Sequence, residues 1–164
     1  MNIFNDFCLK ISYNEIKRWK FILFAVIFNL TMSFFFSFIA HFIFNKDILN
    51  DFKNDFGATL KDKTLWIIII IPFIETLLYQ YAIIEILNKK FNTLISCIIS
   101  ALLFGLSHTY NIFYFLFAFI SGFLFATIYY VGSITRRGIF YTFLTHSIYN
   151  SIAFILNLTF SNHD

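Results

Sequence analysis

The chain alternates long apolar runs with short polar connections. The apolar runs cover approximately residues 21–44, 64–88, 92–110, 111–131 and 138–160. Each run approaches the roughly 20 residues that an α-helix needs to cross the hydrocarbon core of a bilayer. The pattern therefore predicts an all-α, polytopic membrane helix bundle with about five transmembrane helices. Because neither an internal repeat nor a low-complexity linker interrupts it, we expect one membrane domain over residues 1–164.

Two segments are polar enough to lie outside the bilayer core. Residues 1–20 are mixed, and the apolar run that follows them is too long for a signal-peptide core, which indicates a retained first helix. Residues 45–63 carry four Lys and four Asp, with apolar side chains at helical spacing among them. This spacing favours an amphipathic helix in the membrane interface, with a disordered loop as the alternative.

The positions of Lys and Arg predict the orientation of the bundle. Short cytoplasmic loops are enriched in these residues. A cytoplasmic N-terminus places three basic groups on the cytoplasmic side: the cluster from Lys10 to Lys20, the pair Lys89–Lys90 and the pair Arg136–Arg137. The opposite side then receives only the charge-balanced segment 45–63 and the uncharged turn near residue 110.

Composition excludes several other classes of protein. An apolar share of 59% with 26 Phe is more than the surface of a soluble domain can carry. The formal charge is only +3 and no basic block with interleaved aromatics suggests binding to nucleic acid. The two cysteines, Cys8 and Cys97, provide neither a disulfide framework nor a Cys-rich zinc site.

One carboxylate lies near the middle of the second apolar run. An ionised group at that depth costs about 2.5–3.5 kcal/mol on insertion scales, so Glu75 requires partners in the protein or in water. Pro72 precedes it by one turn and removes a backbone hydrogen bond, which predicts a kink that opens space beside the carboxylate. The alternative is a proline that the membrane helix simply tolerates.

Candidate partners for Glu75 occur in two later runs, as His108 and His146. Asn150 follows His146 by four residues, a spacing at which an amide can fix the tautomer of an imidazole one turn away. Counting about 1.5 Å per residue puts Glu75 and His146 near mid-membrane and His108 close to the outer face. A tilted third helix, or one that begins below the interface, would bring His108 inward.

A carboxylate and two imidazoles in one protein-lined pocket allow two kinds of chemistry. They could deprotonate a water and stabilise the oxyanion that forms when it attacks an amide. Glu75, His108 and His146 could instead hold a divalent metal such as zinc, which would lower the pKa of a bound water. Each residue taken singly could equally be a structural hydrogen-bond partner between helices.

In this order the polar groups resemble the CAAX protease and bacteriocin-processing family of intramembrane endopeptidases. The family pattern is Glu-Glu-x-x-x-Arg on one helix, Phe-x-x-x-His on the next and His-x-x-x-Asn or Asp on a later one. The resemblance covers about residues 65–156. The corresponding motifs in this chain are Glu75-Thr76-x-x-x-Gln80, Phe104-x-x-x-His108 and His146-x-x-x-Asn150.

The resemblance implies a role for each matched residue. Glu75 and His108 would activate the attacking water, while His146 and Asn150 would stabilise the oxyanion or complete the polar site. Phe104 would support His108. Thr76 and Gln80 replace the second Glu and the Arg of the family pattern, so we expect a neutral hydrogen-bonding pair where the family has an ion pair.

The function implied by the resemblance is hydrolysis of a peptide bond in a membrane-associated protein or peptide, by a multi-pass protein of the bacterial cell membrane. Family members process prenylated CAAX tails in eukaryotes and are linked to bacteriocin immunity in bacteria. The alternative is a non-catalytic immunity or partner-binding protein on the same scaffold. A small transporter is disfavoured, because the sequence shows no pair of inverted repeats.

Overall fold

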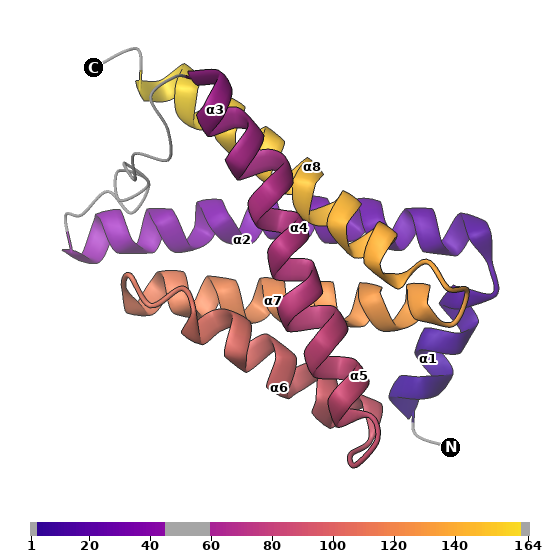
Figure 1. Cartoon of the computed structure of the whole chain (residues 1–164). Helices are drawn as coiled ribbons and strands as arrows, with labels where there is room; N and C mark the ends of the chain where they lie inside the picture. Colours follow the sequence, from indigo (N-terminus) through magenta and orange to yellow (C-terminus); the bar gives the residue numbers. More distant parts are fainter. Residues whose placement is uncertain (1–2, 45–59, 162–164) are drawn as a thin grey trace.

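The computed structural model describes residues 3–44 and 60–161, and within these ranges every regular element is a helix (Figure 1). The predicted all-α bundle is confirmed. Most of the predicted amphipathic helix over residues 45–63 lies outside the described residues. The elements are α1 (Ile3–Ser12), α2 (Glu15–Phe44), α3 (Leu60–Leu65), η2 (Trp66–Ile70), α4 (Ile71–Glu75), η3 (Thr76–Ala82), α5 (Ile83–Leu87), α6 (Thr93–Leu106), α7 (Ile112–Ser133) and α8 (Gly138–Ser161).

The segments from α3 to α5 follow one another as a single long helix. Within the described residues, four helices are long and apolar enough to cross a membrane: Glu15–Ile43, Asp62–Leu87, Ile112–Ser133 and Gly138–Thr159. The fifth apolar helix, α6, has 14 residues and is shorter than the predicted run over residues 92–110. It ends early because the chain turns after Leu106 and reverses into α7.

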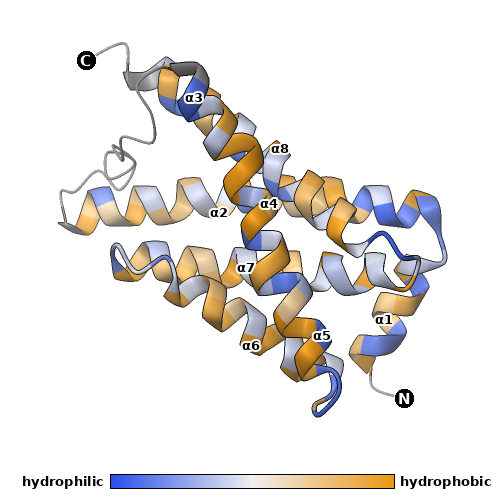
Figure 2. Cartoon of the chain, viewed as in Figure 1, coloured by the Kyte–Doolittle hydropathy of each residue, from blue (hydrophilic) through white to orange (hydrophobic). Residues whose placement is uncertain are grey.

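Hydropathy divides the molecule into apolar helices and polar ends. Figure 2 shows hydrophilic residues gathered at α1, at the start of α2 and at the turns that precede α6 and α8. These parts contain the three predicted basic groups, and Figure 1 places them toward the same end of the bundle. α2 begins at Glu15, so Lys17, Arg18 and Lys20 form its first turns. The arrangement agrees with the orientation that the basic residues predict.

α6 packs against α7 through small residues. A Cβ atom added to Gly122 of α7 would lie 2.9 Å from the Phe104 ring and 3.2 Å from the Ala101 Cα atom of α6. A Cβ atom on Gly105 would lie 3.1 Å from the Cβ atom of Phe119. Small residues let membrane helices approach closely and gain van der Waals contact. This contact fixes α6, and with it Phe104 and His108, against the bundle.

A second close approach joins α7 to α8. A Cβ atom on Gly138 would lie 2.7 Å from the backbone oxygen of Tyr129, and one on Gly132 would lie 2.8 Å from the Cα atom of Gly138. Arg136, in the turn between the two helices, has φ 58°, a left-handed conformation that non-glycine residues seldom adopt. The two glycines therefore allow α8 to start directly beside the end of α7.

α1 packs across the end of α7. Cys8 is fully buried and clusters with Ile11 and Val131, and burial raises the pKa of its thiol to about 12. Cys97 is also buried, and both cysteines are free thiols. Cys8 therefore remains protonated at neutral pH and acts as a small apolar side chain.

Candidate active site

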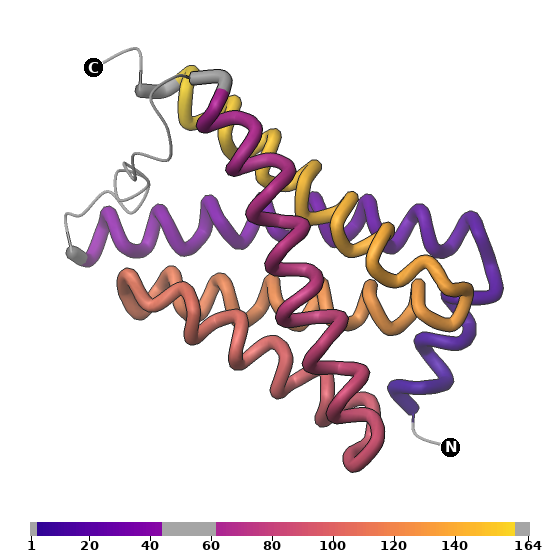
Figure 3. The backbone as a smooth tube through the Cα atoms, viewed as in Figure 1, coloured from indigo at the N-terminus to yellow at the C-terminus, as the bar shows by residue number. Residues whose placement is uncertain are grey.

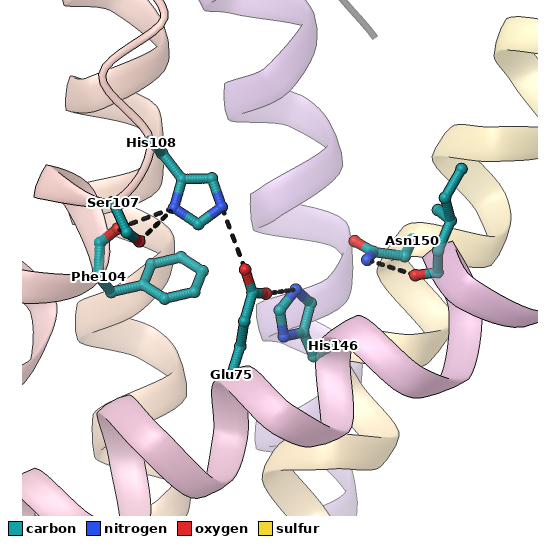
Figure 4. A network of polar contacts seen from close by, with 7 residues as sticks. Glu75, Phe104, Ser107, His108, His146 and Asn150 are labelled. Atoms are coloured by element: carbon teal, nitrogen blue, oxygen red, sulfur yellow. Dashed lines mark hydrogen bonds and ion pairs between the residues drawn. The ribbon is translucent and has the colours of Figure 1, made fainter. Parts of the chain in front are cut away.

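Glu75 lies between the two histidines that the sequence indicates as its partners (Figure 4). Its Oε1 atom is 3.5 Å from Nε2 of His108, and its Oε2 atom is 3.6 Å from Nε2 of His146. The side chains of Glu75 and His108 are 17% exposed and that of His146 is 6% exposed. Each carboxylate oxygen thus faces one imidazole, at a distance longer than the 2.7–3.2 Å range of a direct N–H···O hydrogen bond.

His108 is oriented by the last turn of α6. Its Nδ1 atom lies 2.8 Å from the backbone oxygen of Phe104, which can only accept a hydrogen bond. Nδ1 must therefore carry the proton, and in the neutral ring Nε2 presents its lone pair toward Glu75. The Ser107 hydroxyl donates to the same Phe104 oxygen at 2.7 Å. His108 is accordingly placed to accept a proton or a hydrogen bond at Nε2.

His146 is held by aromatic rings rather than by hydrogen bonds. The Phe125 ring stacks on it with centroids 4.5 Å apart and planes inclined by 26°, and the Phe104 ring meets it edge-on at 5.9 Å. Its Nδ1 atom is buried and has no hydrogen-bond partner among the described residues. A proton on Nε2 points at the Glu75 carboxylate, whereas a proton on Nδ1 would have no acceptor. This favours His146 as a hydrogen-bond donor and gives the two imidazoles opposite roles.

The predicted contact between Asn150 and His146 is wrong. The Asn150 amide donates instead to the backbone oxygen of Ile67, at 2.9 Å (Figure 4). The reason lies in the π-helical segment η2, where the Ile71 amide bonds to the Trp66 oxygen, five residues back. In that register the Ile67 oxygen would pair with residue 72, which is a proline and has no N–H. Asn150 supplies the missing donor.

Pro72 alters the hydrogen-bond pattern of the helix, and the predicted opening of space beside Glu75 stays a prediction. The helix changes to a π-helical pattern just before the proline, and α8 donates to the carbonyl that this change leaves free. Asn150 thereby ties α8 to the long helix. The other role predicted for Asn150, stabilisation of an oxyanion, stays a prediction.

The predicted hydrogen bond between Thr76 and Gln80 does not form. Both residues are fully buried, and the Thr76 hydroxyl and both amide atoms of Gln80 have no hydrogen-bond partner among the described residues. They lie in the π-helical segment η3, whose wider turn aligns positions five apart rather than four. Both side chains are buried, and they do not bond to each other.

The predicted difference in depth between His108 and the other two residues is removed by the inclination of α6. Figure 3 shows α6 running obliquely to α7, from the turn after α5 to the turn that precedes α7. His108 follows the end of α6 and reaches Glu75 from there. Because α6 is short and inclined, His108 in the turn after it lies beside Glu75 in the middle of the long helix.

The three residues are not arranged as a metal site. Within residues 3–44 and 60–161, no group of three or more His, Cys, Asp or Glu side chains is placed to hold a metal ion. The predicted zinc ligands Glu75, His108 and His146 form two contacts that both involve the carboxylate. We derive no catalytic step through a metal.

Several contributors to the site carry no recognisable sequence signal. Phe125, which stacks on His146, is one Phe among 26. The backbone oxygen of Phe104 fixes His108, and a sequence motif cannot show a carbonyl. Tyr114 of α7 lies beside His108, with ring centroids 5.7 Å apart, and only a helical hairpin brings the two together. Ser107 is the exception, because a serine directly before His108 is visible in the sequence as a possible hydrogen-bond partner of the imidazole.

Comparison with known proteins identifies one matching family. Residues 62–152 match the model of the family described as type II CAAX prenyl endopeptidase Rce1-like. The matched region covers more than half of the chain, includes every residue of the site and agrees with the predicted core over residues 65–156. The searches of curated proteins and of solved structures gave no match.

Proposed function

Because the chain belongs to the type II CAAX prenyl endopeptidase Rce1-like family, a family of proteases, we propose that it is an intramembrane endopeptidase that uses Glu75 and His108 to activate water. The substrate class in this proposal is a membrane-associated peptide or protein. The four membrane-capable helices within residues 3–44 and 60–161 make the chain an integral multi-pass membrane protein, and we place it in a bacterial cell membrane. The observation that carries the proposal is the Glu75 carboxylate facing two imidazoles of opposite hydrogen-bonding character.

The first step assigned to the site is the activation of water. A water beside the Glu75–His108 pair donates one hydrogen bond to the carboxylate and one to the free lone pair of His108 Nε2. Glu75 accepts the proton as the water oxygen attacks the carbonyl carbon of the scissile peptide bond. Both bases lie in a largely desolvated setting, where such interactions are stronger than in bulk water.

The second step is the collapse of the tetrahedral intermediate. His146 donates from Nε2 to the oxyanion, and the stacked Phe125 ring keeps the imidazole in place. Glu75 then gives the proton to the departing amine nitrogen, and the carbon–nitrogen bond breaks. Asn150 completes the polar site, chiefly by holding α8 and its His146 against the long helix.

The experiment that tests this function compares wild type with Glu75→Gln. Both are reconstituted in proteoliposomes and given fluorescence-quenched peptides, one set with a farnesylated C-terminal cysteine and one set without the lipid. We expect wild type to cleave at least one set and Glu75→Gln to lose cleavage by about 10²–10⁴-fold. Equal cleavage by the two folded proteins would contradict the proposal.

The same experiment addresses the non-catalytic alternative. Thr76 and Gln80, which are buried and have no hydrogen-bond partner among the described residues, are the observation that favours it, because a charged pair of the family motif is missing. If the protein confers immunity or binds a partner in cells, that activity should disappear in Glu75→Gln when it depends on hydrolysis. Protection that survives the substitution would support a binding role instead.

A further inference from the structure

A second polar feature lies away from the catalytic residues, at the basic end of the bundle. A cleft of about 610 Å³ opens between α5, the end of α7 and the start of α8. Aromatic rings of Phe73, Tyr81, Phe140 and Phe143 line it, and Arg136 and Arg137 lie at its edge. The proposed hydrolysis uses none of these residues.

The cleft and the catalytic residues occupy different faces of the long helix. Phe73 lines the cleft, whereas Glu75 faces the imidazoles, and two residues correspond to a rotation of about 200° on an α-helix. Phe73 is 44% exposed, as is Tyr81, and Phe140 is 54% exposed. The aromatic walls therefore face the surroundings of the bundle, which for these helices is lipid.

The edge of the cleft carries an excess of positive charge. Arg136 and Arg137 are both exposed, and neither is within ion-pair distance of a carboxylate in the described parts of the chain. Arg137 interacts electrostatically with Tyr141 and Glu15. The acidic residue of the cleft, Glu85, already accepts a hydrogen bond from the Tyr129 hydroxyl at 2.7 Å. Arg136 is held in a left-handed conformation between two membrane-capable helices. The guanidinium groups therefore lie where the headgroup region meets the ends of α7 and α8.

We propose that this cleft binds an anionic phospholipid, with the phosphate on Arg136 and Arg137 and an acyl chain along the aromatic walls. Basic pockets between transmembrane helices on the cytoplasmic side are suited to such headgroups. Charge complementarity favours an anionic headgroup. The aromatic walls favour a lipid over a free anion, because a free phosphate would leave them uncovered. The lipid-facing position of the walls favours it over a peptide substrate. The inference does not depend on the proposed hydrolysis.

The test is native mass spectrometry of the full chain in detergent, titrated with phosphatidylglycerol and with phosphatidylcholine of the same acyl chains. We expect wild type to bind phosphatidylglycerol more tightly. Replacing both arginines in Arg136→Gln/Arg137→Gln should weaken that binding by on the order of tenfold or more, since each basic residue near an anionic surface contributes. The matched control is Lys89→Gln/Lys90→Gln, which removes the same charge from the same end of the bundle but outside the cleft. It should bind like wild type.

Two further variants keep the test decisive if the double arginine variant does not fold. Arg136→Gly removes one charge from a position whose backbone suits glycine, and should weaken phosphatidylglycerol binding by about fivefold. Phe140→Ala should weaken the binding of both lipids, because it shortens the apolar wall of the cleft. Equal losses of phosphatidylglycerol binding in the arginine and lysine variants would overturn the proposed site. Displacement of the lipid by acyl-free glycerol phosphate, or by a soluble peptide with a free carboxylate, would also overturn it.

Discussion

Two carboxylates of the long helix, Glu75 and Glu85, lie ten residues apart, and their surroundings differ. Glu85 accepts a hydrogen bond of 2.7 Å from Tyr129 near the polar end of the helix. Glu75 lies mid-helix, faces two imidazoles at 3.5 Å and 3.6 Å, and is 17% exposed. A carboxylate with a well-formed partner at the exposed end of a helix needs no further explanation. A carboxylate buried among groups that can take or give protons is a candidate for catalysis.

The two imidazoles of the site also differ in their surroundings. His108 has a fixed donor at Nδ1 and an available lone pair at Nε2. His146 is packed against aromatic rings, and its buried Nδ1 has no hydrogen-bond partner in the described parts of the chain. The difference assigns proton acceptance to one side of Glu75 and hydrogen-bond donation to the other. The predictions below test that assignment, beginning with the residue whose loss should cost the most activity.

His108→Ala should abolish most of the hydrolysis. We expect a fall of about 10²–10⁴-fold in kcat/KM for whichever reporter peptide wild type cleaves, because the acceptor for the water is lost. Ser107→Ala is the neighbouring comparison, since it removes a hydroxyl that donates to the Phe104 oxygen and lies 3.0 Å from His108 Nδ1, but it leaves the His108–Phe104 hydrogen bond in place. If His108→Ala retains more than a tenth of the activity while Ser107→Ala behaves like wild type, the role assigned to His108 is wrong.

His146→Ala should lower kcat by about 10²–10³-fold, the effect of removing one donor to an oxyanion. His146→Gln keeps a donor of similar reach, so it should recover part of that loss. Steady-state kinetics of both variants separate a donor from a structural ring. Equal activities of the Ala and Gln variants would indicate that His146 acts only through its packing against Phe125.

Asn150→Ala should affect stability more than chemistry. It leaves the Ile67 oxygen without its side-chain donor, at a cost of about 1–3 kcal/mol in the free energy of unfolding. Denaturation in detergent micelles measures this loss, and peptide cleavage by the remaining folded protein measures the catalytic contribution. A fall in kcat beyond tenfold at unchanged stability would instead make Asn150 a direct ligand of the oxyanion.

Tyr129→Phe should have the smallest effect on activity. It removes the hydrogen bond to Glu85, worth about 0.5–1.5 kcal/mol, at a position outside the catalytic site. We expect wild-type kcat/KM and a slightly lower midpoint of thermal unfolding. Loss of cleavage in a stable Tyr129→Phe protein would show that Glu75 and Glu85 are coupled, and the contrast between them would fail.

The sequence predicts the bundle well because long apolar runs leave few alternatives to membrane helices. Family motifs also predict that Glu75, His108 and His146 belong together, and the structure places them in contact. The pairing of Thr76 with Gln80 is wrong because η3 is π-helical, whereas a sequence pattern assumes an α-helical turn. The pairing of Asn150 with His146 is wrong although α8 is α-helical, because Asn150 bonds instead to the Ile67 oxygen of the π-helical η2. Pro72 accounts for the contact of Asn150, since its missing N–H leaves free the Ile67 oxygen that Asn150 binds.

A double-mutant cycle on peptide cleavage tests the account most directly. It compares Glu75→Gln, His108→Ala and the double variant in proteoliposomes, with folding checked by thermal unfolding in each case. If the carboxylate and the imidazole activate one water together, the double variant should be about as inactive as either single variant, because residues that act as a unit are strongly non-additive. Losses that multiply would mean that the two groups work independently and that the proposed site does not operate as one unit.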